Sequence, residues 1–344
     1  MTRYTLSLSL LGAFFLLLST APAQAGDRNR RGGAGAQELL IPFGARTYAL
    51  GGAVTANMTG IEALFSNPAG LAYTGGTEAM FSRVQYVADI GLNYLGVAQT
   101  FGYNTLGLSV QALTFGDIPI TTEDQPEGTG STFNPTFITV GFSYARIFTD
   151  RIAGGVTIKL INESIDRVSA SGVAADLGVQ YVVGETGLRF GVALKNIGPA
   201  MRFDGDGFVR FVNLPEQRPD ATTNGLKINP ASFELPSLMN VGVSYQYRLA
   251  GGAALTAMGN FRSNSFTEDE FQGGLEFNLR DVLYRRGAYA WQQTREDTWF
   301  NGLNFGAGLN LKLATTSLSV DYSYTGTRYA GLGAVQTISV RLKL

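Results

Sequence analysis

Blocks of about ten residues in which apolar and polar side chains alternate recur along most of the chain. In the block at 136–148, apolar residues occupy every second position from Ile138 to Tyr144, and small or hydroxyl residues stand between them. A period of two places each set on one face of a β-strand. The same pattern is found at 302–313. The alternation therefore predicts an all-β protein.

The blocks and their connections predict a barrel. They occupy 77–88, 91–102, 105–114, 136–148, 151–162, 172–183, 187–197, 238–249, 252–263, 270–280, 282–292, 302–313, 315–325 and 334–344. Tight connections alternate with longer ones, and the two longest loops are 115–135 and 199–237. Short turns at one end and long loops at the other are typical of outer-membrane barrels.

A soluble β-sandwich also alternates, but two features favour the membrane. Blocks of about ten residues suit a tilted membrane strand, whereas strands in soluble sheets usually have five or six residues. The polar face is rich in Gly, Ser and Asn and carries scattered charges such as Lys159, Asp176, Glu276 and Asp321, as expected for a lumen. The final block alternates up to Leu344, so it can close a barrel that must have no edge in lipid. We predict a transmembrane outer-membrane β-barrel of about 14 antiparallel strands, spanning 76–344.

The segment at 37–75 has a different character, since it neither alternates nor repeats. It consists mainly of small and apolar residues, and Asn67-Pro68-Ala69-Gly70 reads as a turn. A barrel of this size would otherwise enclose an open aqueous hole. We therefore predict that 37–75 forms an N-terminal hatch in the lumen. The preceding residues 26–36 are rich in Gly and Arg and predict a flexible leader.

The first 25 residues predict export. Arg3 precedes an apolar run from Leu6 to Leu18, and Ala23-Gln24-Ala25 fits the small-x-small cleavage pattern of a signal peptide. The alternative is a transmembrane anchor, but a helical span needs about 20 apolar residues. The predicted location is the outer membrane, with its lipids as one partner.

Composition narrows the chemistry. Only 15% of the 344 residues are charged, the 26 basic residues balance the 27 acidic ones, and the chain has no His and no Cys. Such a balance does not indicate the excess of basic residues that is typical of nucleic-acid-binding proteins. The missing residue types exclude disulfides, Cys/His zinc sites and imidazole-based catalysis. We expect no enzyme, no metal site and no cofactor.

Two stretches resemble a known family. The runs Phe43-Gly44-Ala45-Arg46, Ala49-Leu50-Gly51-Gly52-Ala53 and Leu64-Phe65-Ser66-Asn67-Pro68-Ala69-Gly70 resemble the amino-terminal hatch of the PorV/PorQ family, a branch of the FadL-like outer-membrane barrels. The family's Asn-x-Gly-Pro strand end is matched by Asn196-Ile197-Gly198-Pro199, and its Leu-Pro entry into the next strand is matched by Leu235-Pro236. The resemblance implies these hatch residues: Gly44, Arg46, Gly51, Gly52, Asn67, Pro68 and Gly70.

The resemblance implies a function and an alternative to it. PorV-type proteins are accessory components of type IX secretion, which implies partners among other secretion-system proteins and the carboxy-terminal signals of cargo. FadL itself carries hydrophobic compounds inward, so a passive transporter of a hydrophobic ligand is the alternative. A third class, an outer-membrane hydrolase, is disfavoured because the chain has no His and no recognisable nucleophile motif.

The loop at 199–237 is the candidate partner-binding surface. Leaving a large apolar side chain in water costs about 1.5–3 kcal/mol, so such groups must pack together or meet a partner. The alternative is that the loop folds inward as a lid over the lumen. The candidate residues for partner binding are Met201, Phe203, Phe208, Phe211 and Phe233.

Overall fold

The structure is a computed structural model that describes residues 30, 32–88, 90–212, 224–292, 300–313, 315–329, 331 and 333–344. The predicted signal peptide and the first residues of the leader lie outside the described residues.

The described residues contain 14 long strands that form the barrel, in agreement with the predicted number. They are β1 (Thr77–Gln85), β2 (Gly91–Phe101), β3 (Asn104–Thr114), β6 (Thr136–Thr149), β7 (Ile152–Ile165), β8 (Val168–Val182), β9 (Leu188–Ile197), β13 (Leu238–Arg248), β14 (Ala253–Asn264), β15 (Glu270–Leu279), β16 (Leu283–Gln292), β17 (Phe300–Leu313), β18 (Thr316–Thr327) and β19 (Val335–Lys343). Each overlaps one predicted block. The prediction of an antiparallel barrel of about 14 strands is confirmed.

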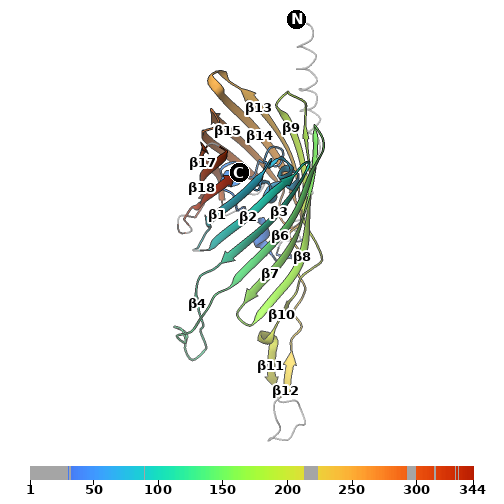
Figure 1. The fold of residues 1–344 in the computed structure, drawn as a ribbon. Helices are drawn as coiled ribbons and strands as arrows, with labels where there is room; N and C mark the ends of the chain where they lie inside the picture. The colour runs from blue at the N-terminus through green and yellow to red at the C-terminus, as the bar shows by residue number, and fades with distance from the viewer. Residues whose placement is uncertain are drawn as a thin grey trace, which may run out of the picture.

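The strands close into a ring (Figure 1). Each pairs antiparallel with its neighbours in sequence, and β1 pairs with β19 in the register Ser82↔Ser339. We call this β1–β19 junction the seam. The pairing of β8 with β9 shifts by one residue between Ala175 and Leu177. Closure leaves no strand edge to be satisfied in lipid.

The outside of the barrel is apolar and the inside is polar. On β6, Ile138, Phe142 and Tyr144 are exposed, whereas Thr139 and Ser143 on the other face of the strand are buried against the interior. Large exposed apolar side chains are found on every barrel strand, and on the described part of β16 the exposed one is Trp291 near the strand end. So large an apolar surface is unfavourable in water and suits a bilayer.

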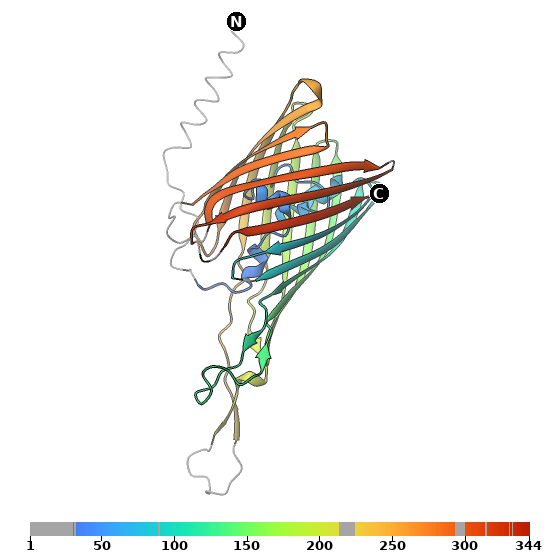
Figure 2. The same cartoon turned by 90° about the vertical axis from the view of Figure 1, so that its left-hand side faces the viewer.

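The two ends of the barrel differ. Short turns such as Gly102–Tyr103 lie at one end, which we call the short-turn end. The other, long-loop end carries two projecting hairpins (Figure 2). The first consists of β4 (Ile118–Pro119) and β5 (Thr132–Phe133), and the second of β11 (Val209–Val212) and β12 (Asn224–Lys227). The loop at 199–237 also contains β10 (Phe203–Asp204) and the 3₁₀ turn η4 (Asp206–Phe208), and η5 (Ala250–Gly252) forms the β13–β14 turn.

Residues 37–75, which we call the inner segment, lie within the ring of strands (Figure 2, blue). They form η2 (Gln37–Leu40), α2 (Ala45–Ala49), α3 (Ala63–Ser66) and η3 (Pro68–Tyr73). Among the described residues, no helix is long and apolar enough to span a membrane. The segment starts beside the long-loop end and leads into β1 at the short-turn end, where Thr77 N donates to Leu344 O at 3.3 Å.

Candidate functional site

The inner segment is attached to the seam through backbone groups. The amide of Ala45 donates to Ser339 Oγ at 2.9 Å, and Ser82 Oγ donates to the carbonyl of Phe43. The two serine hydroxyls are 2.7 Å apart across the β1–β19 junction. The first and last barrel strands therefore hold the same stretch of the inner segment.

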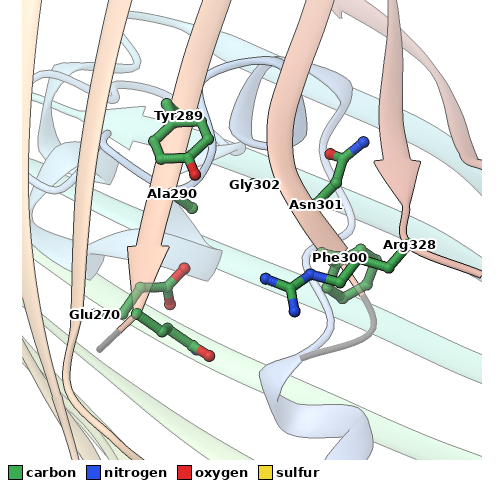
Figure 3. A pocket seen from close by; sticks show the side chains of 8 residues that line it. Glu270, Tyr289, Ala290, Phe300, Asn301, Gly302 and Arg328 are labelled. Carbon is green, nitrogen blue, oxygen red and sulfur yellow. The ribbon is translucent and has the colours of Figure 1, made fainter. Parts of the chain in front are cut away.

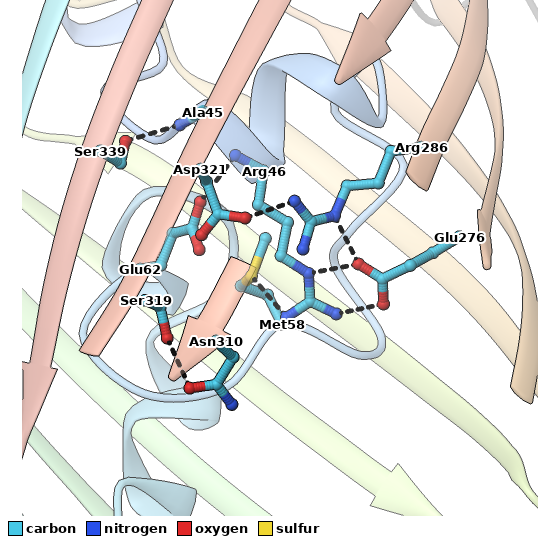
Figure 4. A network of polar contacts seen from close by, with 10 residues as sticks. All are labelled: Ala45, Arg46, Met58, Glu62, Glu276, Arg286, Asn310, Ser319, Asp321 and Ser339. Carbon is cyan, nitrogen blue, oxygen red and sulfur yellow. Dashed lines mark hydrogen bonds and ion pairs between the residues drawn. The ribbon is translucent and has the colours of Figure 1, made fainter. Parts of the chain in front are cut away.

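A buried ionic network, which we call the charged latch, fixes α2 to the barrel (Figure 4). Arg46 donates from Nε and Nη2 to the two carboxylate oxygens of Glu276, at 2.9 and 2.8 Å. Glu276 also accepts from Arg286 Nε at 2.6 Å, and Arg286 pairs with Asp321. Removing one partner from such a network leaves a buried charge without a counter-ion, so its members depend on one another.

Glu62 extends the latch within the inner segment. Its Oε1 accepts a hydrogen bond from the Arg46 amide at 3.1 Å. Burial, followed by the nearby carboxylate of Asp321, raises the pKa of Glu62. A β-carbon on Gly44 would lie 2.4 Å from Glu62 Oε1, so only glycine leaves room for this carboxyl group.

The opposite side of the inner segment rests on glycines of the barrel wall. A β-carbon added to Gly155 on β7 would lie 2.4 Å from the carbonyl of Pro68. On β8, a β-carbon at Gly178 would lie 2.0 Å from Asn67 Oδ1. Such distances are shorter than real contacts, so these glycines allow η3 to approach the wall more closely than any side chain would permit. We call this contact the glycine wall.

Asn67 anchors η3 at the glycine wall. Its Nδ2 lies 3.0 Å from the carbonyls of Thr55 and Val179 and 3.3 Å from that of Val192, which belong to the inner segment, β8 and β9. Its Oδ1 accepts from the Ala69 amide at 3.1 Å and caps η3, and Pro68 occupies the first turn. One amide therefore joins the inner segment to two strands.

The remaining predicted hatch residues support turns of the inner segment. Gly51 and Gly52 have φ of 58° and 83°, a region that side chains rarely adopt. A β-carbon on Gly70 would lie 2.2 Å from the carbonyl of Met58. The seven residues implied by the resemblance thus lie in one segment but contact different walls.

An inner cavity lies between the inner segment and the wall formed by β2, β3, β6 and β7. Its free volume is about 30 Å³, enough for one or two water molecules. It is lined by Leu39, Phe43, Leu64 and Phe65 of the inner segment and by Tyr94, Ser109, Gln111, Thr139, Gly141, Thr157 and Lys159 of the strands. One side is therefore apolar and the other carries hydroxyl and amide groups.

Aromatic rings form the apolar side of the inner cavity. Phe43 stacks on Tyr94 with ring centroids 3.6 Å apart, and it meets the edge of Phe65 at 5.7 Å. Lys195 Nζ lies 3.8 Å from the centroid of the Phe65 ring. The three rings therefore pack mainly on one another.

A second hollow, the mouth hollow, lies at the long-loop end (Figure 3). It is lined by Glu270, Tyr289, Ala290, Gln292, Phe300, Asn301, Gly302 and Arg328. The ring of Phe300 is 6.2 Å from that of Tyr86. Both rings pack against the buried apolar cluster that contains Phe43 and Tyr94. Apolar side chains therefore connect the mouth hollow to the inner cavity.

The half of the 199–237 loop next to the strands folds inward. Met201 is buried and exchanges backbone hydrogen bonds of 2.8 Å with Phe233, whose ring is 5.5 Å from that of Phe203. These side chains pack on a cluster that includes Leu39 and Leu235. Phe203 also pairs with β8 in β10 and so does not lie outside the strands. Three of the five candidate partner-binding residues, Met201, Phe203 and Phe233, therefore pack inward beside Leu39 of the inner segment, and we call this group the lid.

The distal half of this loop points away from the barrel. Phe211 is 73% exposed on the β11–β12 hairpin, and Leu226 and Ile228 are also exposed. Phe208 is half-buried in η4. The five candidate residues therefore fall into two groups with different surroundings.

The described part of the leader is held at the long-loop end. Arg30 pairs with Glu234 at 2.8 Å and lies over the ring of Phe266 at 4.3 Å. Ala34 forms a parallel bridge with Glu234, and the amide of Gly35 donates to the Glu234 carbonyl at 3.0 Å. The leader thus runs alongside the lid before it becomes the inner segment.

Two carboxyl groups are buried beneath the lid. Glu38 in η2 lies against Glu163 of β7, and both are less than 5% exposed. The Gln111 side chain donates to the backbone carbonyl of Glu38 at 3.0 Å. Burial, followed by the charge of Glu163, raises the pKa of Glu38 to about 8. This pair could not be predicted, because positions 38 and 163 are far apart in the chain and no pattern links them.

Neither a protein-family model nor a curated protein sequence matches the chain. Solved structures do. The Ralstonia pickettii toluene transporter TbuX is 14% identical with a TM-score of 0.52, and the match covers 87% of this chain and 97% of that one. The Pseudomonas putida toluene transporter TodX is 12% identical with a TM-score of 0.55, covering 87% and 96%. A Pseudomonas aeruginosa FadL homologue is 13% identical with a TM-score of 0.53, covering 88% and 98%.

These likenesses establish the fold. The chain shares the barrel fold of these structures, in agreement with the antiparallel barrel that the sequence predicts. At 12–14% identity the likeness carries no residue roles.

Proposed function

We propose that the protein is a passive transporter of hydrophobic compounds across the outer membrane, with the inner segment as its gate. One observation carries the proposal: buried apolar side chains connect the mouth hollow to the inner cavity. An apolar solute entering at Phe300 meets apolar contacts as far as Phe43 and Tyr94. The toluene transporters of the same fold lend support at the level of architecture.

Release on the far side requires the inner segment to move. Beyond the inner cavity, η3 and Asn67 lie against the glycine wall so closely that Gly155 and Gly178 have no room for a β-carbon. The charged latch and the seam contacts hold α2 in the same way. A shift of the inner segment relative to either wall opens the path, whereas a rigid inner segment keeps it closed.

A reversible crosslink tests the gate. Ala45→Cys and Ser339→Cys place one thiol on each side of the contact in which the Ala45 backbone amide donates to Ser339 Oγ at 2.9 Å, so the two residues are close enough for a disulfide. The chain has no cysteine of its own, so no other thiol competes. We expect oxidation to suppress uptake of radiolabelled toluene by cells that lack other FadL-like transporters, and reduction to restore it.

The single variant Ala45→Cys under the same oxidation is the matched control. Equal uptake in the oxidised and reduced double variant would rule out the inner segment as a moving gate. Uptake that does not depend on the protein at all would rule out transport of this compound.

A second candidate function is the accessory role in type IX secretion that the PorV/PorQ resemblance implies. The observation that favours it is the exposed apolar surface of the β11–β12 hairpin, where Phe211, Leu226 and Ile228 contact solvent. Exposed apolar side chains on a projecting hairpin suit a protein partner. We propose no catalytic activity, since the chain lacks the imidazole and thiol groups of the usual nucleophile systems.

Phe211→Ser with Leu226→Ser tests this candidate, because both side chains are far from the inner cavity. Loss of type IX cargo secretion and of partner pull-down, with normal toluene uptake, would support the accessory role. Normal secretion and pull-down would exclude the hairpin as a partner-binding surface. Phe203→Ser is the contrasting variant, because Phe203 belongs to the lid.

A further inference from the structure

We infer that the lid locks the inner segment, so that η2 leaves the barrel wall only after the lid has lifted from β8. This inference rests on the proposed transport function, because it states how the gate is regulated. It places that regulation at the long-loop end of the barrel.

The lid and the start of the inner segment share one buried apolar cluster. Its members come from the inner segment, from the 199–237 loop and from the two strands behind them. They are Ala36, Leu39, Met201, Leu235, Ile161, Ala170 and Ala174. Leu39 is 4% exposed, so moving η2 while Met201 stays in place would uncover apolar surface on both sides. The lid therefore stabilises the docked η2 and is stabilised by it.

Backbone hydrogen bonds join the loop to the residues directly before η2. The amide of Gly35 donates to the carbonyl of Glu234 at 3.0 Å, and the amide of Glu234 donates to the carbonyl of Gly33 at 3.4 Å. The ring of Phe233 lies so close to Gly35 that a β-carbon has no room there. Only Ala36 separates Gly35 from η2, so η2 cannot move far while these contacts are intact.

Ala36, the connecting residue, is held in a strained backbone conformation. Its φ of 48° and ψ of 42° lie in the left-handed region, which is unfavourable for a residue with a β-carbon. Such a conformation persists where the surrounding contacts impose it. Here the bonds of Gly35 to Glu234 hold one side, and the Leu39 amide, which donates to the Ala36 carbonyl at 3.1 Å, holds the other. Loss of the lid contacts lets Ala36 relax and so favours release of η2.

The two ends of the loop are held to the wall with different strength. Near its C-terminal end, the buried Asn196 of β9 donates from Nδ2 to the carbonyl of Pro236 at 3.0 Å. Near its N-terminal end, the two residues of β10, Phe203 and Asp204, pair with β8, and Asp204 is exposed. The geometry therefore suits a lid that turns about Pro236 and lifts at β10.

A disulfide between β10 and β8 tests the lock. Asp204→Cys and Ser169→Cys occupy directly paired positions of two antiparallel strands, and both native side chains are exposed. Ile118→Cys with Phe133→Cys is the matched control, because these positions are also directly paired but belong to the β4–β5 hairpin. Amide hydrogen exchange of the purified protein in nanodiscs is followed by mass spectrometry in two stretches, 37–44 with η2 and 66–75 with η3.

We expect oxidation of the Asp204→Cys, Ser169→Cys variant to slow exchange in 37–44 about tenfold relative to its reduced form. Exchange in 66–75 should change much less, because η3 is held at the glycine wall. The control disulfide should change neither stretch. Phe233→Ala tests the same contact without a crosslink, and we expect it to accelerate exchange in 37–44, with barrel assembly checked by heat-modifiable migration.

Two outcomes would overturn the lock. One is equal exchange in 37–44 in the oxidised and reduced lid variant, and the other is an equal slowing by the control disulfide. Toluene uptake by cells that carry the same variants separates the lock from the transport function. Slower exchange with unchanged uptake supports the lock but counts against the inner segment as the gate. Suppressed uptake with unchanged exchange overturns the lock and leaves transport standing.

Discussion

The charged latch and the glycine wall hold opposite sides of the same inner segment by different physics. The latch joins Arg46 to Glu276 and Arg286 through a few strong, directional contacts. The glycine wall lets Pro68 and Asn67 approach Gly155 and Gly178 over a surface without charged groups. A gate needs both a contact that keeps it in place and a contact that fits it closely to the wall. Here the two tasks are assigned to different faces.

The difference predicts how each side fails. A latch fails when one member is lost, because the remaining charges stay buried without a partner. A close-packed wall fails when an atom is added, because nothing nearby can move away. Deletion of a charge and addition of a methyl group are therefore the matched perturbations.

The largest effect is expected for Glu276→Gln. This change leaves the guanidinium groups of Arg46 and Arg286 without their shared carboxylate, at a cost of about 3–5 kcal/mol. We expect a lower midpoint in urea unfolding and a higher conductance in planar bilayers. Asp204→Asn is the control, since the Asp204–Lys227 pair is exposed to solvent and should contribute little to stability. Equal effects of the two changes would contradict the latch.

A smaller effect, about 1–3 kcal/mol, is expected for Gly178→Ala. The new methyl group would lie 2.0 Å from Asn67 Oδ1, so η3 must move away from the wall. The measurements are again urea unfolding and bilayer conductance. Gly273→Ala is the matched control on β15, because its added β-carbon meets no described atom within 4 Å. If both variants behave like the wild type, the close fit at the wall is not a seal.

The smallest effect is expected from a change of pH. This change acts on Glu38 beneath the lid, and it leaves the charged latch and the glycine wall unaffected. The pKa of Glu38 is raised from 4.5 to about 8, so between these values the docked η2 holds a proton that the undocked chain releases. Docking is therefore favoured below this window and weakens as pH rises through it. The arginines of the latch remain charged throughout. We expect conductance to increase between about pH 5 and about pH 9 in the wild type, and much less in Glu38→Gln. A Glu38→Gln profile identical to that of the wild type would exclude this carboxyl group as the source.

The strands were predictable from sequence because the bilayer imposes a simple rule. Each strand must be apolar outside and polar inside, so alternation alone located β6, β17 and β18 to within a few residues. Loop lengths then separated the two ends. The inward charges Glu276 and Asp321 could be assigned to the lumen in the same way.

Contacts across the lumen could not be predicted. That Glu276 meets Arg46, or that Glu38 meets Glu163, depends on the path of a segment without periodicity. The apolar residues of the 199–237 loop show the same limit. Phe211 and Phe233 look alike in the sequence, yet one is exposed on a hairpin and the other packs in the lid. Composition shows that a loop must bury something but not which residues it buries.

The seam has a consequence for how the protein is assembled. Ser82 and Ser339 become neighbours only when the first and last barrel strands pair, and both then hydrogen-bond to the Phe43–Ala45 stretch. In an open sheet the hydroxyls of Ser82 and Ser339 lie on separate edges, so the inner segment can bond to only one of them. It gains both hydrogen bonds when the barrel closes. Insertion of the plug and closure of the cylinder are in this way a single cooperative event. Defects in either should therefore be observed as the same arrested, unclosed species during biogenesis.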